Sequence, residues 1–290
     1  VAAGVYLLVR LHFLFTPDAL IVITCTGAIT ALLGAVGALF QYDIKKILAY
    51  STMSQLGLMV MGIAASPEAS FLHLLNHAFF KAGLFLGAGA IIYAMHMAHH
   101  TEKDVDVQDI RNMGALRTQM PVTFFCFALC SAALAGLPFT SGFISKDIIL
   151  SQLSFSADSI WSYQGLIIIV AWVIAFLTPM YTFRVCWYVF FGKMKNDLVP
   201  LHEAPMVMRI PMIVLAVASL TLAVSFSPFS LTAWTSKLMY LLVFEESTYI
   251  PYVTTFTVIL ALLMGYLLYK NQPTRASYRF LTQNFLLDTL

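Results

Sequence analysis

The stretch "HLLNHAFFKAGLFL", residues 73–86, places three ionisable side chains inside a long apolar part of the chain, residues 70–97. His73, His77 and Lys81 follow one another at intervals of four residues. On an α-helix, this interval puts side chains on one face, one above the next. The sequence therefore predicts a helix that carries a ladder of protonatable groups along one side.

The composition of the whole chain is that of an integral membrane protein. Of its 290 residues, 60% are hydrophobic and 10% are charged, whereas soluble domains carry about 25% charged residues. The net charge of +2 and the lack of Lys/Arg-rich runs argue against nucleic acid as a partner. We expect no cofactor or metal in this chain, because it lacks GxGxxG and Walker motifs and any metal-type cysteine spacing.

Seven apolar stretches are long enough to cross a bilayer, which takes about 20 residues each. They cover residues 19–41, 46–65, 70–97, 120–153, 164–192, 210–228 and 251–270. The alternating segments of a membrane β-barrel are absent from the sequence, so we expect an all-α polytopic membrane protein with a single transmembrane domain over 1–290. Residues 1–15 are too short to span, and we expect this chain to be a fragment that starts near the end of a helix.

The basic residues predict the orientation of the spans. If the span 19–41 runs inward, the inner segments hold most of the lysines and arginines, and the outer loops hold only Arg10 and Lys237. This bias agrees with the positive-inside rule. We expect Arg184 to snorkel from the inner end of its span. Lys81 and Lys146 then remain inside the membrane.

The stretch 120–153 is too long for one continuous span. Its 34 residues would extend about 50 Å as a helix, against a hydrocarbon core of about 30 Å. Gly136, Pro138 and Gly142 lie in its middle, and proline disrupts a helix interior. We therefore expect a broken helix at about 136–142. Irregular backbone at membrane depth surrounds ion sites in transporters, and Lys146 and Asp147 follow the break.

Two interpretations of the ladder are possible. A lysine at mid-membrane costs about 2.5–3.5 kcal/mol on insertion scales and is by default a functional hypothesis. Alternatively, His73, His77 and Lys81 could form a polar lock between packed helices. Three protonatable groups in register, with Lys146 beside a helix break, favour proton handling.

Asp147 has two interpretations that the sequence leaves open. It could join the proton path, or it could be a helix-start charge in a half-helix capped by Ser141 or Ser145. The dipole that favours an acid there disfavours Lys146, so Lys146 is the stronger functional candidate.

Three long motifs carry a family resemblance. "DIKKILAYSTMSQLG" (43–57), "HLLNHAFFKAGLFL" (73–86) and "LPFTSGFISKDIIL" (137–150) closely resemble the antiporter-like subunit 5, the L-type chain, of respiratory complex I, the proton-pumping NADH:quinone oxidoreductase. The motifs are less specific for this subunit over its M- and N-type relatives, the large subunit of multisubunit sodium/proton antiporters and membrane-bound hydrogenase subunits. The resemblance covers the whole chain and weakens after about residue 195.

The resemblance implies an antiporter-like bundle with two inverted five-helix repeats, each containing one broken helix. The fragment would hold most of the second repeat, with N-terminal helices and a C-terminal lateral helix lying outside it. Lys81 matches the central-axis lysine of the family, and His73 and His77 match the histidines that connect it to its neighbours. Lys146 matches the outlet-side lysine, and Asp147 matches its frequent acidic neighbour.

The function implied is that of a proton-translocating subunit of the respiratory chain, driven by electron transport to quinone elsewhere in the complex. NADH, FMN, iron–sulfur clusters and quinone would bind partner subunits, and the M-type antiporter-like subunit would be adjacent. A sodium/proton antiporter subunit is the alternative. A receptor with retinal on Lys81 is a third hypothesis, which leaves Lys146 and the histidines without a role. We expect a multi-pass chain in a bacterial inner membrane, or else in the mitochondrial inner membrane.

Overall fold

The computed structural model describes residues 2–98, 106–155, 163–192, 201–221 and 249–270, and these form helices and short connections. In chain order they are α1 (Ala2–Arg10), η1 (His12–Leu14), α2 (Pro17–Phe40), α3 (Ile44–Gly62), α4 (Pro67–Ala98), α5 (Leu116–Gln119), α6 (Pro121–Ala135), α7 (Ser141–Phe155), α8 (Tyr163–Cys186), the π-helical turn η2 (Trp187–Phe191), α9 (Met206–Thr221) and α11 (Ile250–Tyr269). The predicted all-α class is confirmed.

Each predicted span contains a helix, although the helices differ in length. Among the described residues, four helices are long and apolar enough to cross a membrane on their own: α2, α4, α8 continued by η2, and α11. The helices α6 and α9 are apolar but shorter. The predicted span 210–228 extends beyond the described part of α9, so its second half lies outside the described residues. The chain is a multi-pass membrane protein.

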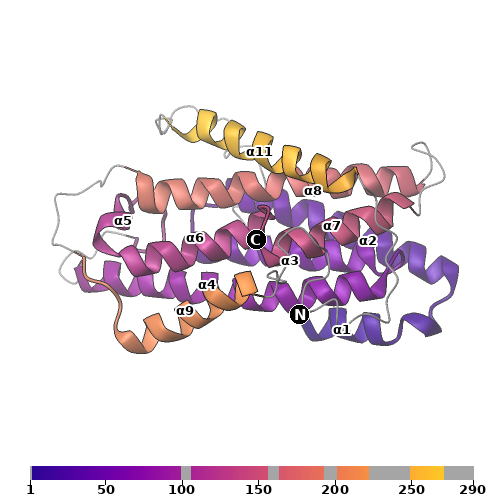
Figure 1. Ribbon diagram of the computed structural model, residues 1–290, viewed down its shortest axis with the longest axis horizontal. Helices are drawn as coiled ribbons and strands as arrows, with labels where there is room; N and C mark the ends of the chain where they lie inside the picture. Colours follow the sequence, from indigo (N-terminus) through magenta and orange to yellow (C-terminus); the bar gives the residue numbers. More distant parts are fainter. Residues whose placement is uncertain (1, 99–105, 156–162, 193–200, 222–248, 271–290) are drawn as a thin grey trace.

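The helices lie mostly along the long axis of the molecule, as Figure 1 shows. The helix α4 is central: it contacts α1, α3, α6, α7 and α9. On the other side, α8 contacts α2, α6, α7 and α11, and α11 lies along α8 at the top of the view in Figure 1. The broken pair α6 and α7 therefore lies between the two long helices α4 and α8.

Small residues allow α2 and α3 to pack with their backbones close together. A Cβ atom at Gly34 would lie 2.5 Å from the backbone nitrogen of Ser54, and one at Gly27 would lie 2.5 Å from that of Met61. Lipid tails are as apolar as the helix surfaces, so the hydrophobic effect does not drive helices together inside a membrane. Close van der Waals packing of this kind is a main source of helix association there. The helices α4 and α8 pack against this closely packed pair.

Arg184 does not snorkel, so that prediction is wrong. Its side chain is 2% exposed, and Nη1 donates a 2.5 Å hydrogen bond to the Leu39 carbonyl at the end of α2. The guanidinium also lies 4.6 Å from the ring centroid of Tyr42. The unpaired carbonyls and negative dipole at the end of α2 favour a cation there. Arg184 therefore ties α8 to the end of α2.

The connection after α4 docks onto the same end of the bundle. Ile44 donates a backbone hydrogen bond to the Gln108 carbonyl, 3.0 Å, and Ile110 donates one to the Tyr42 carbonyl, 2.9 Å. Arg111 then pairs with Asp109, with Nη2 2.5 Å from Oδ2. The hydrogen bond from Arg111 to the Asp109 carboxylate raises the pKa of the guanidinium above its ordinary value. These contacts fix residues 108–111 against the start of α3.

Candidate functional site

The predicted helix break lies between α6 and α7. The helix α6 ends at Ala135, and Gly136 follows in the left-handed conformation with φ 78°. The helix α7 begins at Ser141. The Thr140 hydroxyl accepts a hydrogen bond from the Phe143 N–H at 3.4 Å. The break near 136–142 is therefore confirmed.

The helix-start interpretation of Asp147 is wrong. Thr140 supplies the capping hydroxyl, not Ser141 or Ser145, and the first turn of α7 contains no acidic residue. Asp147 lies in the second turn and is 3% exposed. It accepts a 2.8 Å hydrogen bond from the Thr254 hydroxyl of α11. Asp147 is thus a buried partner between two helices, away from the helix end.

The ladder residues share one buried region of α4. His73 is 0% exposed, and His77 and Lys81 are each 5% exposed. The ring centroids of His73 and His77 lie 6.3 Å apart, and the His77 ring meets Phe80 edge-on at 5.4 Å. The side-chain Nε2 of His77 is buried without a hydrogen-bond partner among the described residues. This nitrogen is therefore free to form a hydrogen bond with a water molecule or another polar group.

His73 links four helices through a chain of polar side chains. Its Nδ1 lies 2.8 Å from the Ser145 hydroxyl of α7, and its Nε2 lies 3.1 Å from Oε1 of Gln55 on α3. Gln55 in turn donates from Nε2 to the Thr178 hydroxyl of α8 at 3.4 Å. The chain lies deep in the bundle, since His73, Gln55, Ser145 and Thr178 are all 0% exposed.

The two buried lysines are both held by neutral oxygen atoms. The Lys81 ammonium donates to the Leu48 carbonyl at 3.1 Å and to the Ser51 hydroxyl, both on α3. The Lys146 ammonium donates to the Leu134 carbonyl, one of the carbonyls left unpaired at the end of α6. The negative end of the α6 dipole therefore favours the Lys146 charge, although the dipole of its own half-helix, α7, disfavours it.

A small cavity reaches the hydrogen-bond partners of both lysines. It is lined by Leu48 and Ser51, which accept from Lys81, and by Leu134, which accepts from Lys146. Ser131 and Thr182 add hydroxyl groups to its wall. Its volume of about 10 Å³ is close to the minimum needed for one water molecule. Neither lysine lines this cavity, and its lining is mostly apolar, so the cavity does not by itself connect the two ammonium groups.

Several residues of this region were missed from the sequence: Gln55, Ser51, Thr178 and Thr254. Ser51 and Gln55 lie four residues apart in the motif 43–57, so they share one face of α3. That spacing was an available signal. Thr178 and Thr254 lie in apolar spans, and nothing in their local sequence indicates their partners.

Glu203 was also missed, although it positions the broken span. One oxygen of its carboxylate accepts from the backbone N–H of Val122 at 2.6 Å and of Thr123 at 3.2 Å. The other accepts from the Thr123 hydroxyl at 2.9 Å. An acidic group satisfies the unpaired N–H groups and the positive dipole at the start of a helix. Glu203 therefore fixes the first turn of α6.

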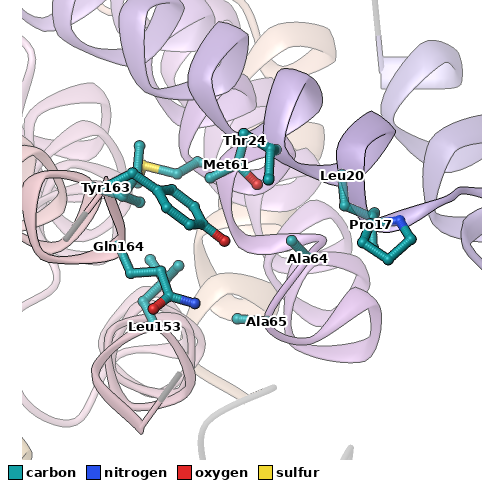
Figure 2. A pocket seen from close by; sticks show the side chains of 11 residues that line it. Pro17, Leu20, Thr24, Met61, Ala64, Ala65, Leu153, Tyr163 and Gln164 are labelled. Atoms are coloured by element: carbon teal, nitrogen blue, oxygen red, sulfur yellow. The ribbon is translucent and has the colours of Figure 1, made fainter. Parts of the chain in front are cut away.

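A larger cavity lies away from the charged residues, where the start of α2 meets the end of α3, the end of α7 and the start of α8. Its volume is about 180 Å³, and most of its lining is apolar. Figure 2 shows the Thr24 and Tyr163 hydroxyls pointing into it. None of His73, Lys81 and Lys146 lines this cavity, so it is separate from the candidate site.

Metal binding finds no support in the described part of the chain. Among those residues, no group of three or more His, Cys, Asp or Glu side chains is placed to hold a metal ion. The four cysteines, Cys25, Cys126, Cys130 and Cys186, are free thiols.

Comparison with known proteins identifies the family of the chain. A family model described as NADH:quinone oxidoreductase/Mrp antiporter, TM, matches residues 1–178. The chain belongs to this family. The description of the family names both NADH:quinone oxidoreductases and Mrp antiporters. Family membership alone therefore does not distinguish between these two kinds of protein.

The similar curated proteins are named for the redox enzyme. "NADH-quinone oxidoreductase subunit L" of Escherichia coli (strain K12) is 42% identical over 224 residues, covering 76% of this chain and 34% of the relative. "NADH-ubiquinone oxidoreductase chain 5" of Cryphonectria parasitica is 39% identical, covering 76% of this chain and 33% of the relative. The chain spans about a third of the length of the curated relatives it matches.

Solved structures share the fold. The Mrp complex from Dietzia sp. DQ12-45-1b matches with a TM-score of 0.67 and 24% identity, covering 97% of this chain and 32% of that chain. The archaeal membrane-bound sulfane sulfur reductase matches with a TM-score of 0.68 and 24% identity, covering 94% of this chain and 46% of that chain. At this identity the likeness establishes the antiporter-like helix bundle and nothing further.

Proposed function

We propose that this chain is part of a proton-translocating membrane subunit of NADH:quinone oxidoreductase, which moves protons through Lys81, Lys146, His73, His77 and Asp147. The observation that carries the proposal is the pair of buried lysines, each of which donates to neutral oxygen atoms. An ammonium held by neutral oxygens can lose its proton without leaving a buried carboxylate unpaired.

The path that we propose runs along the interface of α4 with α3 and α7. Protons pass between Lys81 and Lys146 through intervening water, since water-mediated hydrogen bonds replace direct ones at little cost. His73 and His77 continue the path along α4, and their ring centroids are 6.3 Å apart. Asp147 adds a carboxylate next to Lys146 and connects the path to α11 through Thr254.

The rest of the assembly belongs to the same proposal. The chain would hold most of the second of two inverted five-helix repeats, with its first repeat and a lateral helix outside the present sequence. NADH, FMN, iron–sulfur clusters and quinone would bind other subunits, and an M-type antiporter-like subunit would lie next to this one. Quinone reduction elsewhere in the complex would drive the proton movement.

A sodium/proton antiporter subunit is the second candidate. The Mrp antiporters share the family model and the fold, and the same lysines could serve ion exchange. The relatives that match at 39–42% identity are named as subunits of the NADH enzyme. We therefore favour the redox-driven pump.

Copurification distinguishes the two candidates. We expect that the full-length protein, tagged and extracted from its native membranes in mild detergent, copurifies with subunits that oxidise NADH and reduce a quinone analogue. The activity should follow the tagged protein through size-exclusion chromatography. A complex that contains only small membrane subunits and does not oxidise NADH would contradict the proposal of a redox-driven pump. It would support the proposal of a sodium/proton antiporter subunit.

A further inference from the structure

The two residues that contact the His73 ring each have a second hydrogen-bond partner. The Ser145 hydroxyl donates to the Ser141 carbonyl at 3.1 Å, so its oxygen is left to accept a hydrogen bond from Nδ1 of His73, 2.8 Å away. A hydroxyl has one donor hydrogen and two acceptor lone pairs. While the Ser145 hydroxyl donates to the Ser141 carbonyl, Nδ1 must carry the hydrogen of the contact with Ser145.

The Gln55 side chain imposes the same condition on the other ring nitrogen. Its amide nitrogen donates to the Thr178 hydroxyl, and that hydroxyl donates in turn to the Ile174 carbonyl at 2.7 Å. The Gln55 carbonyl oxygen therefore faces Nε2 of His73 as an acceptor, at 3.1 Å. When both partners accept, the ring is satisfied as an imidazolium, which donates from both nitrogens; when the Ser145 hydroxyl donates to Nδ1 instead, the neutral ring is satisfied.

A neutral His73 needs one of these partners to turn. If Nδ1 loses its proton, rotation of the Ser145 hydroxyl from the Ser141 carbonyl onto Nδ1 restores every hydrogen bond of the ring. If Nε2 loses its proton instead, Gln55 must turn over and Thr178 must release the Ile174 carbonyl. The first change is a single bond rotation, so Ser145 is the easier partner to move.

The carbonyl that Ser145 leaves does not become unpaired. The amide nitrogen of Asn76 donates to the same Ser141 oxygen at 3.1 Å. A buried polar atom without a partner costs about 1–3 kcal/mol, and Asn76 removes that cost. The three residues are 0–3% exposed, so bulk water does not take over their role.

We propose that Ser145 and Gln55 are positioning residues that let His73 take up and release a proton, with the Ser145 hydroxyl turning between the Ser141 carbonyl and Nδ1. This inference rests on the proposed function, because it assigns His73 a changing proton count. In the proton-bearing state Ser145 and Gln55 accept from the ring, and in the neutral state Ser145 donates to it. No covalent bond other than the bond to the exchanged proton changes.

Few charged groups act on His73 from the surrounding helices. His77 lies on the same helix, and Lys146 lies on α7 directly after Ser145. The helices α3 and α8 present neutral side chains there, Gln55 and Thr178. Exchanging one of the neutral groups for a charged one is therefore a direct way to bias the proton on His73.

The test measures the pH profile of NADH-driven proton pumping in sealed vesicles that contain the whole complex. Ser145→Ala removes a hydrogen bond that is stronger to an imidazolium than to a neutral ring. We expect the midpoint of the profile to move to lower pH by roughly half a unit to one unit. Gln55→Glu places a carboxylate beside Nε2, and we expect the opposite shift.

Two further variants separate this role from simple packing. Ser145→Thr keeps the hydroxyl and should restore the profile of the unmodified complex. Ser154→Ala is the matched control, because Ser154 lies on the same helix and its hydroxyl bonds the Leu150 carbonyl at 2.7 Å, away from His73. It should leave the profile unchanged.

The outcomes distinguish the inference from the proposed function. Opposite shifts in the Ser145→Ala and Gln55→Glu complexes would support the positioning role. Superimposable profiles, or shifts in the same direction, would overturn it, while a Lys81→Met complex that lost pumping in the same assay would leave the proposed function standing. If Lys81→Met pumped normally, the proposed function itself would be wrong.

Discussion

Sealed vesicles containing the complex with Lys81→Met are expected to build a much smaller pH gradient during NADH oxidation than unmodified vesicles. Methionine has a similar length and cannot carry a proton. Among the described residues, the Lys81 ammonium donates to the Leu48 carbonyl and the Ser51 hydroxyl, both on α3. Replacing a buried charge with an apolar side chain of similar volume is often neutral for stability, so the loss should be functional. The gradient is followed with a pH-sensitive dye.

Lys45→Met is the matched control for this change. Lys45 is exposed in the first turn of α3, and its backbone N–H, not its side chain, bonds Asp43. Its removal should leave the gradient unchanged. Equal gradients in the Lys81→Met and Lys45→Met vesicles would show that Lys81 is not needed for proton movement.

Gly142→Ala is expected to prevent stable assembly of the protein. A Cβ atom at Gly142 would overlap the carbonyl oxygen of Ala133, where the start of α7 passes the end of α6. The obstacle is backbone, which cannot rotate away as a side chain can. Overpacking costs about 1–3 kcal/mol and sometimes more, and here it also displaces the Lys146 contact with the end of α6. The measurement is the yield and thermal unfolding temperature of the purified complex.

Gly89→Ala separates this clash from the general effect of adding a methyl group. Gly89 lies inside α4, and the nearest atom to a Cβ there is the flexible end of Met208, at 3.9 Å. Alanine favours the helix over glycine by about 1 kcal/mol. The Gly89→Ala complex should therefore assemble normally. A Gly142→Ala complex that is equally stable would mean that α6 and α7 can separate without loss.

The sequence predicts those features that depend on spacing along one helix. The interval of four between His73, His77 and Lys81 places them together on α4, and the length of 120–153 with Gly136 and Pro138 predicts the break. Both depend only on the geometry of a single helix and on the thickness of a bilayer. The membrane class follows from composition alone.

The features that the sequence does not predict are contacts between helices that are distant in the chain. Gln55 and Ser145 meet His73 because α3 and α7 both pack against α4. Arg184 is buried rather than snorkelling because the end of α2 and the Tyr42 ring lie beside it. Asp147 likewise meets Thr254 of α11, 107 positions away. No local spacing determines such pairings, so the partners had to be observed.

The most direct test of the account compares Lys81→Met, Lys146→Met and the double variant in one vesicle assay, as the gradient formed per NADH oxidised. Residues that act in one path lose function together, so their effects are not additive. We predict that each single variant lowers the ratio and that the double variant lowers it no further. A normally assembled complex in which both single variants keep the full ratio would contradict the account and assign the buried lysines to helix packing.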